Sequence, residues 1–119
     1  MPIRPGTVFE PQLISEALDK VPIAVTIFDL QGTMLYYNEH STRVISRKPE
    51  HLGRDIRLCH QKPESNRRID RMIEEFKQGR REPISYEANP YGTRLLISVV
   101  PLEVEGRLAA FLHTATPKP

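Results

Sequence analysis

The sequence predicts an α+β domain in which a five-stranded antiparallel sheet carries helices on one face and follows an N-terminal helix. Three observations predict this fold. Five short segments are strand-like and are separated by turn residues. Two of them precede and three follow a middle region whose apolar residues recur at helical spacing. The strand-like segments are rich in β-branched residues and joined by short turns, which favours antiparallel pairing.

The N-terminal end of the chain is predicted to contain an arm followed by a helix. Residues 1–10 hold two prolines and a glycine, which favour an irregular N-terminal arm. A helix is expected to begin at Pro11, because proline suits the first helical position. It ends before Pro22, since the residue preceding a proline avoids helical backbone angles. Its apolar residues recur at helical spacing and are Leu13, Ile14, Ala17, Leu18 and Val21.

The next segment is typical of a β-hairpin. Residues 25–30 are apolar and strand-like, residues 29–32 form an Asp-Leu-Gln-Gly turn, and residues 33–37 form the return strand. Asn38 can cap the short helix that follows, because its side chain can accept hydrogen bonds from the first helical amides. Residues 47–53 then form a connector.

One long helix and three strands are predicted for the rest of the chain. The helix shows the spacing of a single buried stripe, and Gly79 is a suitable stop. Strands are expected at residues 84–88, 94–102 and 108–114, followed by a Pro-Lys-Pro tail at residues 117–119 that is frayed or a linker. The buried stripe of the helix consists of Ile69, Met72, Ile73 and Phe76.

Length and composition indicate one domain, expected to span residues 11–116. The chain has 119 residues and a net charge of +2 with acids and bases interspersed, so the concentrated basic face of a nucleic-acid-binding protein is not expected. The only cysteine, Cys59, cannot form an internal disulfide, which fits a reducing compartment. The chain lacks the apolar run of a secretory signal and the roughly 20 apolar residues of a membrane span. We therefore expect a cytoplasmic protein without a membrane partner.

The layout resembles that of PAS domains over about residues 12–116. The hairpin that ends in Tyr36-Tyr37-Asn38 and runs at once into a helix is typical of that family. The middle of the chain is similar to a PAS subfamily that has a Cys-His-Pro-Pro-Lys-Ser signature and often follows a DUF438 or hemerythrin-like module. The residues that carry this likeness are Tyr36, Tyr37, Gly53, Arg54, Cys59, His60, Lys62, Ser65, Phe76 and Gly79.

A similar Leu-His-Pro-Glu-Lys-Ser segment occurs in the PAS domain of RcoM-type carbon monoxide sensors, where the histidine binds haem iron and matches His60. The resemblance therefore implies haem b with His60 on the iron. Two departures concern the rest of the site. Gln61 replaces the proline after the histidine, and Ile84-Ser-Tyr-Glu-Ala lacks the methionine that supplies the second axial ligand in those sensors. The cysteine motif of light-sensing PAS domains is also missing around Cys59.

Two neighbouring residues are the candidate iron ligands. A neutral imidazole is a good iron ligand when its second nitrogen is oriented by a hydrogen bond. His60 can point under the sheet, or it can cap backbone groups or face solvent. Cys59 can supply a thiolate to haem iron, or it can be a small buried hydrophobe, as most free cysteines are. We favour His60 as the ligand and Cys59 as packing, because neighbouring residues rarely face one pocket together.

Apolar side chains are expected to wall the cofactor space. Ile69, Met72 and Ile73 of the long helix can do so, although their plain role is the core between helix and sheet. Leu112 is the expected wall residue on the last strand, and His113 beside it is a reserve ligand. Three cations, Arg47, Lys48 and Arg54, can meet carboxylates such as haem propionates, but solvated surface positions are favoured for them.

The expected function is that of a PAS sensory domain. It binds haem b, senses a diatomic gas or a redox state, and signals through a separate partner protein. Two alternatives remain open: a cofactor-free dimerisation or docking module, and a PAS domain that binds a small organic ligand. A Cys59–His60 catalytic pair is disfavoured because a nucleophile needs a base across a site and an oxyanion hole, so no enzyme is expected. A homodimer is expected, with residues 11–21 in its interface.

Overall fold

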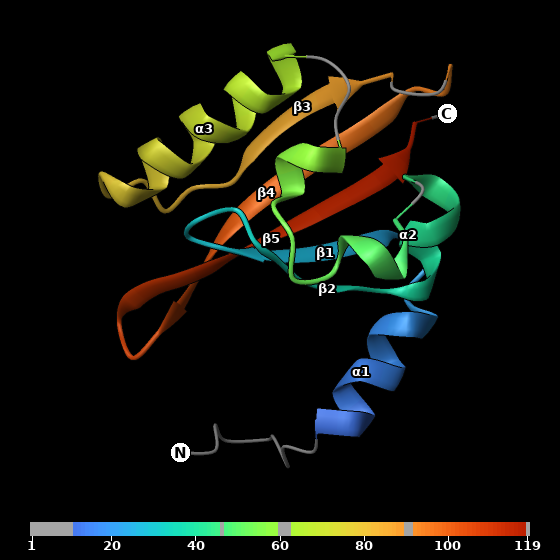
Figure 1. The fold of residues 1–119 in the computed structure, drawn as a ribbon. Coiled ribbons are helices and arrows are strands. Elements are labelled where there is room, and N and C mark those ends of the chain that lie inside the picture. The colour runs from blue at the N-terminus through green and yellow to red at the C-terminus, as the bar shows by residue number, and fades with distance from the viewer. Residues whose placement is uncertain (1–10, 46, 60–62, 90–91, 119) are drawn as a thin grey trace.

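The computed structural model describes residues 11–45, 47–59, 63–89 and 92–118, which form an α+β fold (Figure 1). A five-stranded sheet carries helices on one face, and an N-terminal helix precedes it, so the predicted fold class is confirmed. The elements in chain order are α1 (Pro11–Lys20), β1 (Ala24–Asp29), β2 (Met34–Tyr37), α2 (Glu39–Val44), the 3-10 helices η1 (Pro49–His51) and η2 (Ile56–Cys59), α3 (Pro63–Lys77), β3 (Ile84–Ala88), β4 (Leu95–Val104) and β5 (Arg107–Pro117).

The strands pair antiparallel in the order β2-β1-β5-β4-β3, so the last strand lies at the centre of the sheet. Figure 1 shows α2, η2 and α3 along one face of this sheet, whereas α1 extends away from the rest of the domain. Residues opposite one another on neighbouring antiparallel strands share a face, so the strand register assigns each side chain to the helix-covered face or to the other face. We call the helix-covered face the inner face.

The hydrophobic core lies between α3 and the inner face. The Phe111 ring centroid is 5.1 Å from that of Phe28 on β1 and 5.4 Å from that of Phe76 on α3. The predicted helical stripe is confirmed, because all four of its residues belong to this core. Burying each such side chain contributes about 1.5–3 kcal/mol. Buried core residues from the strands include Ala24, Phe28, Leu95, Ile97, Val99, Phe111 and Ala115.

The last strand is longer than the sequence indicated. It was expected to end at Thr114, but β5 continues to Pro117. A proline is tolerated there because β1 pairs with β5 only as far as Ala115, so this end of β5 has β4 as its single neighbour. The chain also stays attached beyond the strand. The Lys118 backbone amide donates to the Arg94 carbonyl oxygen at 2.9 Å, and the Lys118 ammonium pairs with Glu87.

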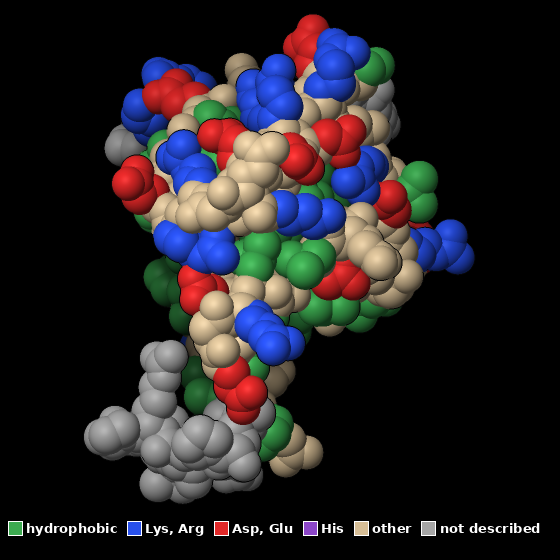
Figure 2. All heavy atoms as spheres, turned by 90° about the vertical axis from the view of Figure 1, so that its left-hand side faces the viewer, with side chains coloured by type: hydrophobic (Ala, Val, Ile, Leu, Met, Phe, Trp, Pro, Cys, Tyr) green, Lys and Arg blue, Asp and Glu red, His purple; other side chains and the backbone are tan. Residues whose placement is uncertain are grey.

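Charged side chains of both signs are mixed on the surface. On the face shown in Figure 2, basic and acidic side chains lie among one another, with apolar side chains visible between them. Surface ion pairs include Arg81–Glu103 and Arg94–Glu87. Such exposed pairs contribute little to stability, so the fold depends on its core. Within the described part of the chain, every helix is too short or too polar to cross a bilayer.

Replacing Phe76 tests whether α3 and the sheet share one core. Phe76 is fully buried, so Phe76→Ala should lower the free energy of unfolding by about 3–5 kcal/mol through lost burial and the cavity left behind. Urea denaturation followed by circular dichroism measures this change. Val104→Ala is the matched control, since Val104 is exposed and its truncation should cost less than about 0.5 kcal/mol. Equal losses for the two variants would contradict this account of the core.

Candidate functional site

Polar side chains occupy the middle of the otherwise apolar inner face. Thr26 on β1 lies opposite His113 on β5, and His113 lies opposite Val99 on β4, so the three share one row across the sheet. Thr26 is fully buried and His113 is only 5% exposed. The neighbouring rows are apolar and contain Phe111 on one side and Ala115 on the other. The row of Thr26 and His113 is therefore a polar strip inside the core.

A buried guanidinium lies over this strip. Arg47 belongs to the connector between α2 and η1 and is only 5% exposed, and its Nε donates to Thr26 Oγ1 at 3.3 Å. The sequence favoured a solvated surface position for this residue, and that interpretation is wrong. Lys48 and Arg54, the other two cations of the same prediction, are exposed as expected. The structure thus brings one of the three predicted carboxylate-binding cations into the space between helices and sheet.

A phenol and a second guanidinium complete the cluster. Tyr86 lies on the inner face of β3, opposite Ile97, and the Arg68 guanidinium carbon of α3 is 4.2 Å from its ring centroid. Burial raises the pKa of Tyr86, while the charges of Arg68 and Arg47 and a hydrogen bond from Arg68 act in the opposite direction. The Arg68 guanidinium therefore lies against Tyr86, whereas Arg47 is bonded to Thr26. Thr26, Arg47, Arg68, Tyr86 and His113 together are called the inner polar cluster below.

The apolar residues that were predicted to wall the cofactor space fall into two groups. Ile69, Met72 and Ile73 are buried on α3 as part of the core. Leu112 lies between Phe111 and His113 on β5, opposite Ile27 and Val100, and therefore points to the face of the sheet away from α3. The structure does not bring Leu112 together with the three α3 residues.

The two candidate iron ligands from the sequence lie at the edge of what the structure describes. Cys59 is the last residue of η2, and only its backbone is described. His60 lies outside the described residues. Of the described histidines, His113 is buried, whereas His40 and His51 are half-buried. His113, the reserve ligand predicted from the sequence, thus has its imidazole in the core rather than on the surface.

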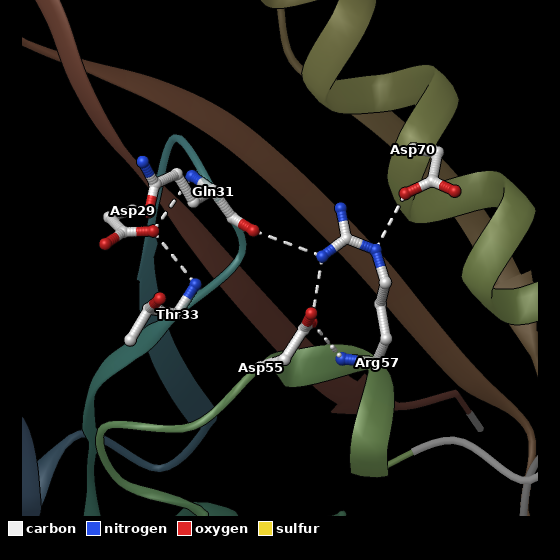
Figure 3. A network of polar contacts seen from close by, with 6 residues as sticks. All are labelled: Asp29, Gln31, Thr33, Asp55, Arg57 and Asp70. Atoms are coloured by element: carbon white, nitrogen blue, oxygen red, sulfur yellow. Dashed lines mark hydrogen bonds and ion pairs between the residues drawn. The ribbon is translucent and has the colours of Figure 1, made fainter.

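A network around Arg57 positions the segment that leads to His60 (Figure 3). The Arg57 side chain of η2 donates to Asp55 Oδ1 at 2.8 Å, to the Gln31 carbonyl oxygen at 3.1 Å and to Asp70 Oδ1 at 2.7 Å. These contacts join η2 to the β1–β2 turn and to α3. Burial lowers the pKa of Arg57, but its bonds to Asp70 and Asp55 outweigh burial and the net pKa is raised. The guanidinium therefore stays charged in this network.

Glycine is required in the turn that Arg57 contacts. Gly32 has φ +91°, a conformation that side chains rarely adopt, and a Cβ there would lie 2.5 Å from Arg57 Nη1. Asp29 Oδ1 fixes the same turn by accepting from the Gln31 and Thr33 amides, both at 2.9 Å. The turn and η2 thus hold each other in place.

A buried carboxamide joins α1 to the start of β1 and to α2. Asn38 caps α2 as the sequence predicted, since its Oδ1 accepts from the Ser41 amide at 3.1 Å. The same oxygen accepts from the Val25 amide of β1 at 2.9 Å. Its Nδ2 donates to the carbonyl oxygens of Leu18 at 2.8 Å and Ile23 at 2.9 Å. One side chain therefore links the end of α1, the start of β1 and the first turn of α2.

The comparisons with known proteins agree with this architecture. Residues 14–109 match the PAS domain family, so the chain belongs to that family. A C-terminal domain from Streptococcus mutans has a similar structure, with a TM-score of 0.79 and 19% identity over 98% of this chain and 90% of that one. The PAS domain of BvgS from Bordetella pertussis gives a TM-score of 0.74 and 16% identity over 91% and 85%.

A sensory box sensor histidine kinase from Vibrio cholerae is also similar, with a TM-score of 0.64 and 23% identity over 90% of both chains. No curated protein matches the sequence. These structural similarities show that the fold is shared with the three solved proteins.

Proposed function

We propose that this chain is a sensory binding domain rather than an enzyme, and that its ligand lies between the inner face and the helices. The inner polar cluster is the observation that carries this proposal. Buried polar and charged groups cost free energy that apolar residues of the same volume would avoid. Buried polar and ionisable groups therefore often mark functional sites. The similar proteins include a sensor histidine kinase, which supports a place in signal transduction.

Haem b, with His60 on the iron, is the ligand that we propose. The described residues fit the chemical groups of haem. Arg47 offers a buried guanidinium for a carboxylate, and Ile69 and Met72 offer apolar contact. Bound haem would supply an iron centre that takes a diatomic gas or changes redox state. The likeness to the DUF438-associated subfamily and to RcoM-type sensors remains the source of the His60 assignment.

The route from ligand to α1 is short. Arg47 contacts Thr26 on β1, and the preceding residue, Val25, is bonded to Asn38, which holds the end of α1. Suppose that the domain has two conformations, which differ in the position of Arg47 and of α1. A ligand then shifts the balance between them only as far as its affinities for the two conformations differ. A separate downstream signalling protein would then produce the response to the ligand.

Hemin titration tests the haem proposal. The wild-type protein should give a saturable one-to-one Soret shift, because one imidazole and an apolar site hold one haem. His60→Ala should abolish or strongly weaken this shift, and Cys59→Ser should leave it largely intact. His113→Ala is the matched histidine control and should also retain haem. Loss of haem in His113→Ala but not in His60→Ala would place the ligand on β5, and no binding by the wild type would remove haem from the account.

We also propose that the domain forms a homodimer through α1. This helix has ten residues and buries none of them, and Leu13 and Ile14 are 58% and 42% exposed. So short a helix is marginal in water unless its apolar side is covered. A groove of about 540 Å³ beside it includes Leu35 and Leu52, both of which are exposed. A second copy of α1 would cover these side chains, and the same surface would serve a cofactor-free docking module.

Light scattering tests the dimer. The double change Leu13→Glu and Ile14→Glu should give a monomer, because it places charge where apolar side chains would be buried. Gln12→Glu, at an exposed polar position of the same helix, is the control and should remain dimeric. A double variant with the mass of a dimer would contradict an interface through α1.

A further inference from the structure

We propose that His51 is a pH-responsive catch on the connector that carries Arg47 into the core. Neutral His51 holds the connector in place, and protonated His51 releases it. The catch needs no ligand, because every contact that it uses lies within the described part of the chain. It gives the domain a second input, the acidity of its surroundings, beside the proposed ligand.

The imidazole of His51 caps the 3-10 helix η1. Lys48 is the residue before this helix, and its backbone amide donates to His51 Nδ1 at 3.1 Å. The His51 amide donates in return to the Lys48 carbonyl oxygen at 2.9 Å. These reciprocal bonds form a capping box, in which glutamate or glutamine is the usual side-chain acceptor. A histidine in this place makes the cap sensitive to pH in the range near neutrality.

The cap requires an unprotonated Nδ1. A backbone amide can only donate, so Nδ1 has to accept, and the ring proton of neutral His51 lies on Nε2. Protonation adds a second N–H to the ring, so that a donor then faces the amide donor. The bond to Lys48 is therefore present only while His51 is neutral.

The cap fixes the backbone beside Arg47. The Arg47 amide donates to the carbonyl oxygen of buried Ser41 at 3.3 Å, and the next amide along the chain, that of Lys48, donates to His51. From this stretch, Arg47 Nε reaches Thr26 Oγ1 of β1 at 3.3 Å. Loss of the cap therefore removes one of two adjacent backbone bonds that direct Arg47 toward β1.

The surroundings of His51 favour its neutral form. Burial lowers the pKa of His51 and the charge of Arg47 lowers it further, while Glu50 raises it and Lys48 lowers it by smaller amounts. The net pKa is below the ordinary value of about 6.5. An imidazolium there would also repel the charges of Arg47 and Lys48, so protonation weakens the connector in two ways. Arg54, whose side chain is exposed, meets His51 through its backbone amide, which donates to the His51 carbonyl oxygen at 3.2 Å.

Charged groups on the neighbouring elements form pairs of their own. On η2, Arg57 is paired with Asp55 at 2.8 Å. On α2, Arg43 is paired with Glu39 at 3.8 Å and lies 3.4 Å from His40 Nδ1. The charges that act on the imidazole are therefore mainly those of its own connector and helix.

The direction of the response follows from the lowered pKa. Because the folded protein favours neutral His51, the catch is fully engaged above about pH 6.5 and weakens as the pH falls through the lower pKa of the folded state. Arg47 then leaves Thr26 more readily. The next residue toward the N-terminus, Val25, is bonded to Asn38, so acid acts on the same route to α1 that is proposed for a ligand.

Two-dimensional NMR between about pH 8 and about pH 5 tests the catch. In the wild type, the amide signals of Arg47, Lys48 and Thr26 should shift together, with the midpoint of the His51 ring. The protection of the Arg47 amide against exchange should fall at least about threefold on the acid side, as expected for loss of a cap. His51→Gln keeps an acceptor that cannot be protonated, so its signals should stay fixed. His40→Gln is the matched control and should titrate like the wild type.

A second variant tests the released state directly. His51→Ala lacks the acceptor at every pH, so its Lys48 and Thr26 signals should lie near their acid positions already at about pH 8. A Thr26 titration that persists in His51→Gln would belong to His113, which lies opposite Thr26, and would overturn the catch. Wild-type signals that stay fixed while the His51 ring titrates would overturn it as well.

Discussion

The buried carboxamide of Asn38 is the interaction on which the arrangement of this domain depends. Its side chain makes four hydrogen bonds, and its backbone amide donates to the Val25 carbonyl oxygen at 3.0 Å. No solvent reaches it, so each partner would lose its bond without compensation if the carboxamide were removed. A core of apolar side chains fixes the sheet and α3, but it does not reach α1. The position of α1 relative to the sheet depends instead on polar contacts at Asn38.

A second contact supports the same junction. Asp19 of α1 accepts from the Glu39 backbone amide at 2.9 Å and from the Tyr36 hydroxyl at 3.3 Å. Burial raises the pKa of Tyr36, and the nearby charge of Asp19 raises it further, so the phenol keeps its proton as a donor. Asn38 and Asp19 thus join α1 to the hairpin and α2 through polar contacts. A junction of this kind can change its geometry at lower cost than a packed core, which suits a domain whose ends carry a signal.

The sequence was sufficient for the parts of the fold that follow from local patterns. The stripe through Ile69 and Phe76 has a helical period, and the capping role of Asn38 follows from its position before a helix. The face of Leu112 could not be predicted, because Phe111 and Leu112 are both apolar and alternation gives no sign there. Only the register with β1 and β4 assigns it to the outer side.

The inner polar cluster was harder to predict. Arg47 lies in a connector without periodicity, and a charged residue in such a segment is usually solvated. Its burial depends on contact with Thr26, a residue 21 positions away in the sequence. Tyr86 and His113 are also joined to the cluster only through the sheet. Long-range pairing therefore determines the site, whereas local sequence determines the elements that carry it.

Hydrogen exchange in an Asn38→Ala variant tests the central role of this residue most directly. Amide exchange of Val25, Ser41 and α1 should accelerate at least about tenfold more than that of Ile73 and Phe76 in the α3 core, because the variant removes bonds only at the junction. Thr42→Ala, at an exposed site on α2, is the control and should leave these amides nearly unchanged. Exchange that changes equally at the junction and in α3, or at neither, would contradict the account.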